Sequence, residues 1–301
     1  MSAFLISRVG RPGRHPASML YDDVSESSAA VVIRRYSSSF GLASRLLDRP
    51  VRTRVRNIYA LVRVADEIVD NPDRTLGRDS RDRMLTGLQQ DALQALQTGY
   101  SANLVVHAFA RTAVACGIGA DLVDPFFASM RMDLDTRTHT PDSFARYVYG
   151  SAEVVGLMCL HAFLLERPAG ERASAYDRLA PGARRLGAAF QKLNFLRDLA
   201  EDHDDLSRCY FPGLEVERFD DAARDRILDD IDSDLAAAAG VIRDLPASSR
   251  RAVRAAHATF DELARRLRAT PATQIRRQRV RVPSPVKLRI AARAAAYGGD
   301  R

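Results

Sequence analysis

The sequence predicts an all-α protein that folds as a single domain, and three observations favour this class. Apolar residues recur every three or four positions over long segments, as they do in helices with one buried face. Short stretches containing Gly and Pro separate these segments, and strand-like alternation is scarce outside residues 279–282. A chain of 301 residues can bury a sizeable core in one large helical domain, and nothing in it requires a second.

Residues 1–20 contain Arg, Gly and Pro without helical periodicity, so we expect a mobile arm followed by a domain at residues 21–301. The apolar run at residues 3–6 is too short for the core of a secretory signal. We also find no stretch that approaches the length of a transmembrane helix. These observations predict a cytoplasmic protein.

The first strongly periodic segment ends in a pair of aspartates. Its apolar side chains share one helical face: Ile58, Leu61, Val62, Ala65 and Val69. Asp66 and Asp70 are four residues apart, so a helix places them one above the other beside that face. The turn-forming residues at 71–73 then end the helix.

Turn and cap signals divide the middle of the chain. Gly117 and Gly119 indicate an interhelical turn, since a dinucleotide-binding loop would need a third glycine between a strand and a helix. Thr140 and Pro141 are typical of a helix start, with Thr as the N-cap and Pro at the first helical position. Further breaks are expected at residues 167–170, 211–213 and 245–246.

The second acidic segment, at residues 190–202, repeats the arrangement of the first. Its apolar face consists of Phe190, Leu193, Leu196 and Leu199. Its oxygen-bearing side chains recur at four-residue intervals, which stacks them on a helix: Asn194, Asp198 and Asp202.

Like charges at this spacing destabilise a helix by roughly a few tenths of a kcal/mol per pair, and a divalent cation removes that repulsion. A single acidic stripe is most often a solvated helix face. Here two stripes occur, and Arg63 and Arg197 place a cation beside each. The pair therefore predicts two facing walls around a diphosphate held with Mg²⁺.

Four separated motifs resemble those of the squalene and phytoene synthases, enzymes that join two isoprenoid diphosphates head to head. They read YSSSF at 36–40, DEIVD at 66–70, VGLM at 155–158, and QKLNFLRD at 191–198 followed by RCYFP at 208–212. Their order and spacing agree from about residue 30 to residue 290. The resemblance implies an isoprenoid synthase helical fold with a central cavity, the acidic helices at its mouth and an apolar tunnel beneath.

By position, the resemblance also assigns roles to individual residues. The implied Mg²⁺ ligands, which would also accept Mn²⁺, are Asp66, Asp70, Asn194, Asp198 and Asp202. The implied diphosphate contacts are Tyr36, Ser37, Ser38, Ser39, Arg63, Gln191, Arg197 and Tyr210. The implied cavity-lining residues are Phe40, Tyr59 and Tyr149. The implied catalytic group is Asp66, Asp70, Asp198, Asp202, Arg63 and Tyr149.

The sequence departs from the family pattern at three positions. Tyr36 stands where the family often has His, and Ser38 stands where it often has Lys. Glu153 replaces a small or hydroxyl-bearing residue just before the VGLM motif. These changes leave the metal ligands intact but bear on the shape of the substrate pocket.

The motifs are most similar to those of bacterial carotenoid enzymes, so the resemblance implies a phytoene synthase, a Mg²⁺-dependent prenyltransferase of carotenoid biosynthesis. Such an enzyme joins two geranylgeranyl diphosphates through a cyclopropylcarbinyl (prephytoene) diphosphate. The reaction ends by proton loss, to released diphosphate or to a tyrosine, and needs no nicotinamide cofactor. One alternative is a thirty-carbon dehydrosqualene, squalene or hopanoid-pathway synthase that uses farnesyl diphosphate. A second is a non-catalytic assembly factor of the same fold, which would tolerate loss of the metal ligands.

The net charge of +7 comes almost entirely from arginine. The basic tail at residues 276–293 is either a solvated face or a contact for an anionic membrane, at about 1 kcal/mol per cation near the surface. Arg279 or Arg281 would alternatively reach the diphosphate site. No zinc-finger or RNP-like motif accompanies the charge, so nucleic acid is not an expected partner. The three cysteines lie far apart without C-x-x-C spacing and suggest neither a disulfide framework nor a zinc site.

Overall fold

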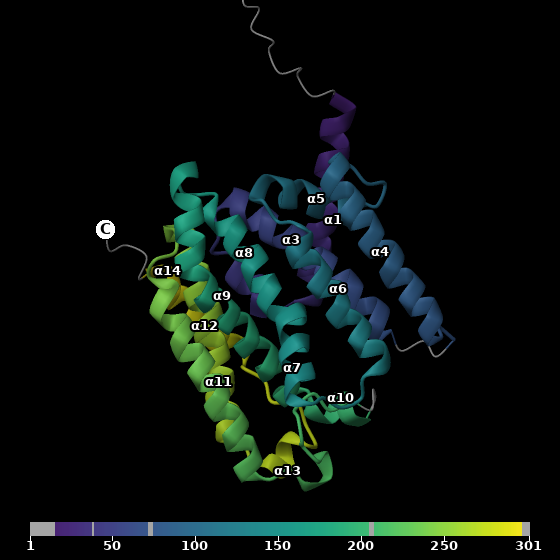
Figure 1. The fold of residues 1–301 in the computed structure, drawn as a ribbon. Helices are drawn as coiled ribbons and strands as arrows, with labels where there is room; N and C mark the ends of the chain where they lie inside the picture. Colours follow the sequence, from purple (N-terminus) through teal and green to yellow (C-terminus); the bar gives the residue numbers. More distant parts are fainter. Residues whose placement is uncertain (1–15, 38, 72–74, 205–207, 297–301) are drawn as a thin grey trace, which may run out of the picture.

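The computed structural model describes residues 16–37, 39–71, 75–204 and 208–296. Among these residues there is no strand, and Thr138 and Cys209 form only an isolated bridge. The helices drawn in Figure 1 are α1 (Pro16–Tyr36), α2 (Ser39–Ser44), α3 (Arg49–Asp70), α4 (Arg78–Thr98), α5 (Leu104–Cys116), α6 (Ala120–Asp135), α7 (Pro141–Val148), the π-helical turn η1 (Tyr149–Glu153), α8 (Val154–Leu164), α9 (Ala169–Arg197), α10 (Leu199–Asp204), the 3₁₀ turn η2 (Val216–Arg218), α11 (Asp221–Ile242), α12 (Ala247–Arg268), α13 (Ala272–Ile275) and α14 (Ser284–Ala296). The predicted all-α class is confirmed.

Local signals explain several helix ends. Thr140 and Ser143 form a reciprocal capping box at the start of α7, with the Ser143 N–H donating to Thr140 Oγ1 at 3.2 Å. Gly117 ends α5 in the left-handed conformation, with φ of 75°. Helix α1 begins at Pro16, so residues 16–20 of the predicted arm are helical. The rest of the predicted arm, residues 1–15, lies outside the described residues.

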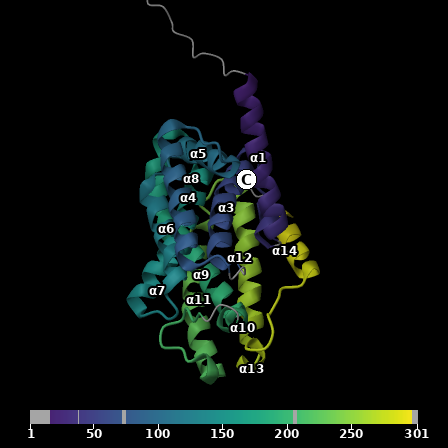
Figure 2. The same ribbon diagram turned by 90° about the vertical axis from the view of Figure 1, so that its right-hand side faces the viewer.

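Apolar contacts on both sides of the central helices make up the core. One cluster packs α3 to α6 against α8 and contains Phe109, Phe126 and Phe127. A second joins α9, α11 and α12 to the segment that follows α10, around Leu193 and Leu228. Figures 1 and 2 show long helices running side by side, with α9 packed against both α8 and α11. All three cysteines are free.

One helical run is long and apolar enough to resemble a membrane span, contrary to the expectation from sequence. It covers Pro141–Leu164, which comprises α7, η1 and α8, with a mean hydropathy of 1.3. The fold buries 61% of its most apolar window, as expected for a helix in a protein core. Packing against the neighbouring helices therefore accounts for its composition.

Helix α9 approaches α8 and the preceding turn η1 closely because glycine stands at both contacts. A Cβ atom on Gly156 would lie 2.6 Å from the Ala183 carbonyl oxygen, and one on Gly187 would lie 2.5 Å from the Ala152 carbonyl oxygen. Only glycine allows backbones to approach this closely without displacement. Because Asn194 follows Gly187 on the same helix, this crossing helps to place the second acidic segment.

Candidate active site

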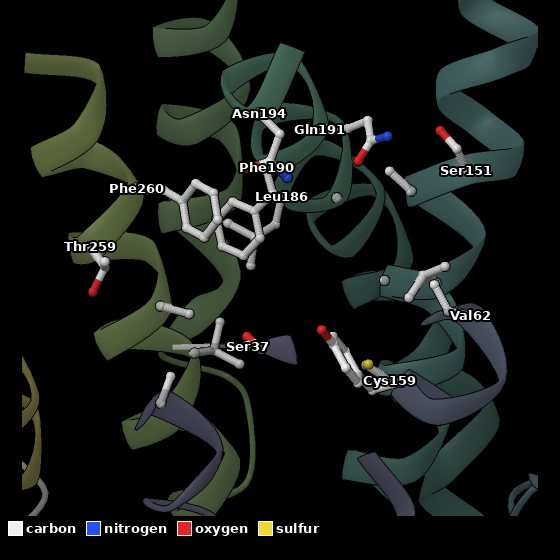
Figure 3. A pocket seen from close by; sticks show the side chains of 18 of the residues that line it. Ser37, Val62, Ser151, Cys159, Leu186, Phe190, Gln191, Asn194, Thr259 and Phe260 are labelled. Carbon is white, nitrogen blue, oxygen red and sulfur yellow. The ribbon is translucent and has the colours of Figure 1, made fainter. Parts of the chain in front are cut away.

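A cavity of about 1010 Å³ lies between α3, α8, α9, α11 and α12. Its lining residues recur at three- and four-residue intervals along each helix, so one face of each helix forms a wall. On α3 the wall includes Val55, Tyr59, Val62, Asp66 and Asp70. Figure 3 shows side chains from several helices converging on this space. The predicted central cavity is therefore present.

Both predicted acidic segments border one end of the cavity, where Asp66, Asp70, Asn194, Asp198 and Asp202 line it. Burial and the neighbouring Asp70 raise the pKa of Asp66 to about 7. Burial also raises the pKa of Asp202 to about 7, with contributions from Asp198 and from Asp70 on the other segment. The two segments therefore face each other across the opening.

The second acidic segment consists of two helices rather than one. Helix α9 ends at Arg197 and α10 begins at Leu199, with Asp198 between them. The four-residue spacing survives this break because the Asp198 N–H donates to the Asn194 carbonyl oxygen and the Asp202 N–H to the Asp198 carbonyl oxygen, both at 2.9 Å. The three oxygen-bearing side chains consequently reach the same cavity.

Arginine side chains pair with carboxylates at the opening. Arg208 Nη1 donates to Asp70 Oδ1 at 2.8 Å. Asp198 accepts from Arg197 Nε at 2.8 Å and from Arg279 Nη2 at 3.1 Å. Arg279 was one of two tail residues expected to reach this site, and it does so from the coil that leads into α14.

The donor set at the opening suits Mg²⁺, which prefers oxygen ligands supplied by one or two carboxylates. Two facing segments contribute these oxygens. Burial is the main cause of the raised pKa of Asp66 and Asp202, and repulsion from neighbouring aspartates adds to it; a cation between the segments would offset that repulsion. Among the described residues, no group of three or more His, Cys, Asp or Glu side chains is placed to hold a metal ion. The ligand chemistry fits Mg²⁺, and the metal site itself stays a prediction.

More cations lie near the same opening. Arg281 and Lys287 line the cavity together with Arg197 and Arg279. Burial lowers the pKa of Lys287, and the charges of Arg197 and Arg281 lower it further. This end of the cavity therefore combines carboxylates with cations that can bind an anionic head group directly.

The Ser-rich motif reaches the cavity at its first two positions. Tyr36 and Ser37 line it, and the Arg63 guanidinium lies 4.6 Å from the centre of the Tyr36 ring. Ser37 hydrogen-bonds the Tyr59 side chain, which also lines the cavity. Ser38 lies outside the described residues, as do the side chains of Ser39 and Phe40, so the contacts expected of them stay predictions.

Sequence reasoning missed Asp133, a buried carboxylate on α6 that lines the cavity. It accepts hydrogen bonds from the Tyr147 hydroxyl at 2.7 Å and the Tyr210 hydroxyl at 3.1 Å. Arg208 donates to the Asp133 carbonyl oxygen at 3.0 Å, which links this group to Asp70. Burial raises the pKa of Asp133 to about 6, although Arg208 and both tyrosines oppose the shift.

Tyr149 lies outside the described cavity wall, and the roles that the resemblance implies for it stay predictions. Its ring lies 5.1 Å from the Arg184 guanidinium carbon and is absent from the described cavity wall, which contains Tyr147 instead. Residues two positions apart point in nearly opposite directions on a helix. Glu153 also turns away, since its Oε2 accepts from Arg184 Nε at 2.6 Å and the residue does not line the cavity.

The remaining predicted contacts, Gln191, Arg197 and Tyr210, all line the cavity. Away from the opening the wall is mainly apolar, and Phe190 stacks on Phe260 with ring centroids 3.8 Å apart (Figure 3). The site can therefore bind an anionic head group at one end and shield a long apolar chain from water along the rest.

Comparisons with known proteins agree with this geometry. Residues 33–285 match the family model described as squalene/phytoene synthase. A 15-cis-phytoene synthase of Enterobacter agglomerans is 34% identical over 184 residues, which is 58% of this chain and 58% of that protein. A phytoene synthase of Pseudescherichia vulneris is 28% identical over 258 residues, which is 77% of this chain and 79% of that protein. The match thus spans less than two thirds of the first relative.

Solved structures show the same fold. A dehydrosqualene synthase superposes with a TM-score of 0.74 at 19% identity, covering 93% of this chain and 98% of that one. A squalene synthase from Alicyclobacillus acidocaldarius superposes with a TM-score of 0.70 at 16% identity, covering 83% of this chain and 95% of that one.

Proposed function

Because this chain belongs to the squalene/phytoene synthase family, we propose that it joins two molecules of geranylgeranyl diphosphate head to head to form phytoene. The observation that carries the proposal is the single cavity with facing acidic segments at one end and an apolar wall along the rest. Relatives named phytoene synthase support the twenty-carbon substrate. The proposal includes dependence on Mg²⁺ and no nicotinamide cofactor.

The diphosphate head groups would bind where cations line the opening. Arg63, Arg197, Arg279 and Lys287 all line the cavity there and can donate charge-assisted hydrogen bonds to phosphate oxygens. Mg²⁺ would be held by Asp66, Asp70, Asn194, Asp198 and Asp202. When bound there, it supplies positive charge that stabilises the diphosphate as a leaving group.

The apolar wall would protect the carbocation that forms when the carbon–oxygen bond breaks. Water would quench such a cation, so its lifetime depends on exclusion of water from the cavity. Tyr59, Phe190 and Phe260 line this space, and aromatic rings can stabilise positive charge. Attack by the double bond of the second chain, with loss of one proton, would give the cyclopropylcarbinyl diphosphate. Departure of its remaining diphosphate, rearrangement and loss of a second proton would then yield the hydrocarbon. The proton acceptor would be either released diphosphate or a tyrosine; among the tyrosines that line the cavity, Tyr147 would be the candidate because its hydroxyl donates to Asp133.

A thirty-carbon product is the second candidate. A 4,4′-diapophytoene synthase of Staphylococcus haemolyticus is 27% identical over 200 residues, and the dehydrosqualene synthase has the same fold over nearly its whole length. This alternative keeps the chemistry and changes only the length of the prenyl chains.

The first test incubates the purified protein with Mg²⁺ and either geranylgeranyl or farnesyl diphosphate, without a reductant. We expect phytoene from the twenty-carbon substrate, identified by mass spectrometry of the extract. A thirty-carbon product from farnesyl diphosphate alone would select the second candidate. Failure to consume either substrate would reject the proposed reaction.

Substitutions at the opening separate an enzyme from a non-catalytic assembly factor. Asp66→Asn and Asp198→Asn should each lower turnover at least about a hundredfold, because both remove charge from the proposed metal site. Asp177→Asn is the matched control, since Asp177 is an exposed carboxylate on α9 that does not line the cavity. Equal activity of all three variants would contradict the metal-site proposal.

A further inference from the structure

The cavity extends away from the acidic opening to a far end that buried apolar residues border. On α3 its lining residues run from Asp70 back to Val55, a distance of about 22 Å at 1.5 Å per residue. On α9 they run from Asp198 back to Leu179. Val55 on α3 and Leu179 on α9 therefore mark a part of the cavity that lies far from the head-group site.

Two apolar clusters close this region. One contains Leu160, Leu164, Ala175, Leu179, Ile242 and Leu245. The other contains Leu47, Val51, Val55 and Ala252. Phe163 of α8 packs against both clusters and also lines the cavity. Its ring therefore contacts both clusters at the end of the space available to a substrate chain.

We propose that Phe163 sets the longest prenyl chain that the cavity accepts. This inference rests on the proposed function, since it concerns the apolar tail of the same substrate. A chain that extends past the cavity end must displace the ring, and well-packed apolar interiors resist such insertions. A single methylene changes discrimination in an apolar pocket by about 10- to 200-fold, so an additional isoprene unit should be rejected clearly.

The test compares kcat/KM for allylic diphosphates of fifteen, twenty and twenty-five carbons. Phe163→Ala should raise the ratio of the longer to the shorter substrate at least tenfold, because it removes the ring from the cavity end. Ala252→Leu should lower that ratio, because Ala252 lines the same end from α12 and packs in the same cluster as Phe163. Phe163→Leu and Ala252→Leu carry the test if Phe163→Ala fails to fold.

Phe260→Ala is the matched control. It removes the same side chain from a different part of the wall, where Phe260 stacks on Phe190. Phe260→Ala should change kcat/KM for all three substrates without changing which chain length is preferred. An equal shift in chain-length preference in this control, or no shift in folded Phe163 variants, would overturn the proposal.

Binding separates this inference from the proposed reaction. Unreactive thiolodiphosphate analogues of the three chain lengths serve as probes. They should raise the Tm of the wild type only up to a limiting chain length. In Phe163→Ala, analogues longer than that limit should also raise the Tm. A shift in this limit without turnover would support the cavity-end role and reject the reaction. No stabilisation by any analogue would overturn both.

Discussion

Tyr147 is the single residue whose role is most open to direct test. Its hydroxyl donates to Asp133 inside the cavity, whereas the Tyr149 ring lies near Arg184 outside it. We expect Tyr147→Phe to lower kcat about ten- to a hundredfold, since a hydrogen bond to a charged group contributes about 1.5–3 kcal/mol. The measurement is steady-state turnover with Mg²⁺.

Tyr149→Phe is the control, because it removes the same hydroxyl two residues away. Its turnover should stay within about twofold of the wild type, as expected where no hydrogen bond to a charged group is lost. Tyr149→Phe should unfold near the temperature of the wild type, whereas Tyr147→Phe should unfold several degrees lower because it loses a buried hydrogen bond, so turnover is compared well below both transitions. Equal losses in turnover would contradict the different roles assigned to the two tyrosines.

These tyrosines also show where sequence information runs out at the residue scale. The spacing of Asp66 and Asp70 predicted neighbours correctly because both lie on one helix. Asp133 meets Tyr147 and Tyr210, which are 14 and 77 residues away in the chain, so no local pattern could reveal it. The resemblance pointed to Tyr149, but which of two residues on one helix faces inward depends on tertiary packing.

At the scale of elements, the close crossing of α8 and α9 helps to place the second acidic segment. Gly156→Ala should push the Cβ into the Ala183 carbonyl oxygen and cost about 1–3 kcal/mol, the usual penalty for overpacking. This corresponds to a fall in Tm of roughly 2–10 °C for a domain of this size. Thermal unfolding followed by circular dichroism measures it.

For Gly240→Ala we expect the opposite effect, a rise in stability. Gly240 lies within α11, and nothing is within 4 Å of the position its Cβ would occupy. Because alanine favours a helix over glycine by about 0.8–1 kcal/mol, this variant should raise Tm slightly. A stabilising effect of Gly156→Ala would show that the backbones do not approach as closely as the structure places them.

The ends of helices could be predicted where the local sequence contains a capping or turn residue. Thr140 and Pro141 marked the start of α7, and Gly117 marked the end of α5. The break between α9 and α10 at Asp198 was not predicted, because neither glycine nor proline stands there. The side chains still share one cavity, since backbone hydrogen bonds across the break preserve the four-residue spacing.

At the scale of the whole molecule, the acidic opening opposes folding when its carboxylates are ionised. The pKa of Asp66 and of Asp202 is raised to about 7, and that of Asp133 to about 6, chiefly by burial. The folded state therefore binds more protons than the unfolded state from about pH 4 to about pH 8, and the free energy of unfolding falls as the pH rises through that window. Burial lowers the pKa of His139 and of His161, so these two residues make the folded state more stable as the pH rises. In more acidic solution their effect opposes that of the aspartates.

We therefore expect the Tm of the protein in EDTA to fall by a few degrees between about pH 6.5 and pH 8, where the aspartates dominate the linkage. Mg²⁺ should reduce this fall, because a bound cation stabilises the ionised carboxylates of the folded state. Asp66→Asn should roughly halve the fall in EDTA, because Asp202 still titrates near pH 7, whereas Asp177→Asn should leave it unchanged. The measurement is Tm against pH with and without Mg²⁺. A profile that is flat in EDTA would contradict the raised pKa values, and equal slopes in both buffers would contradict Mg²⁺ binding at the opening.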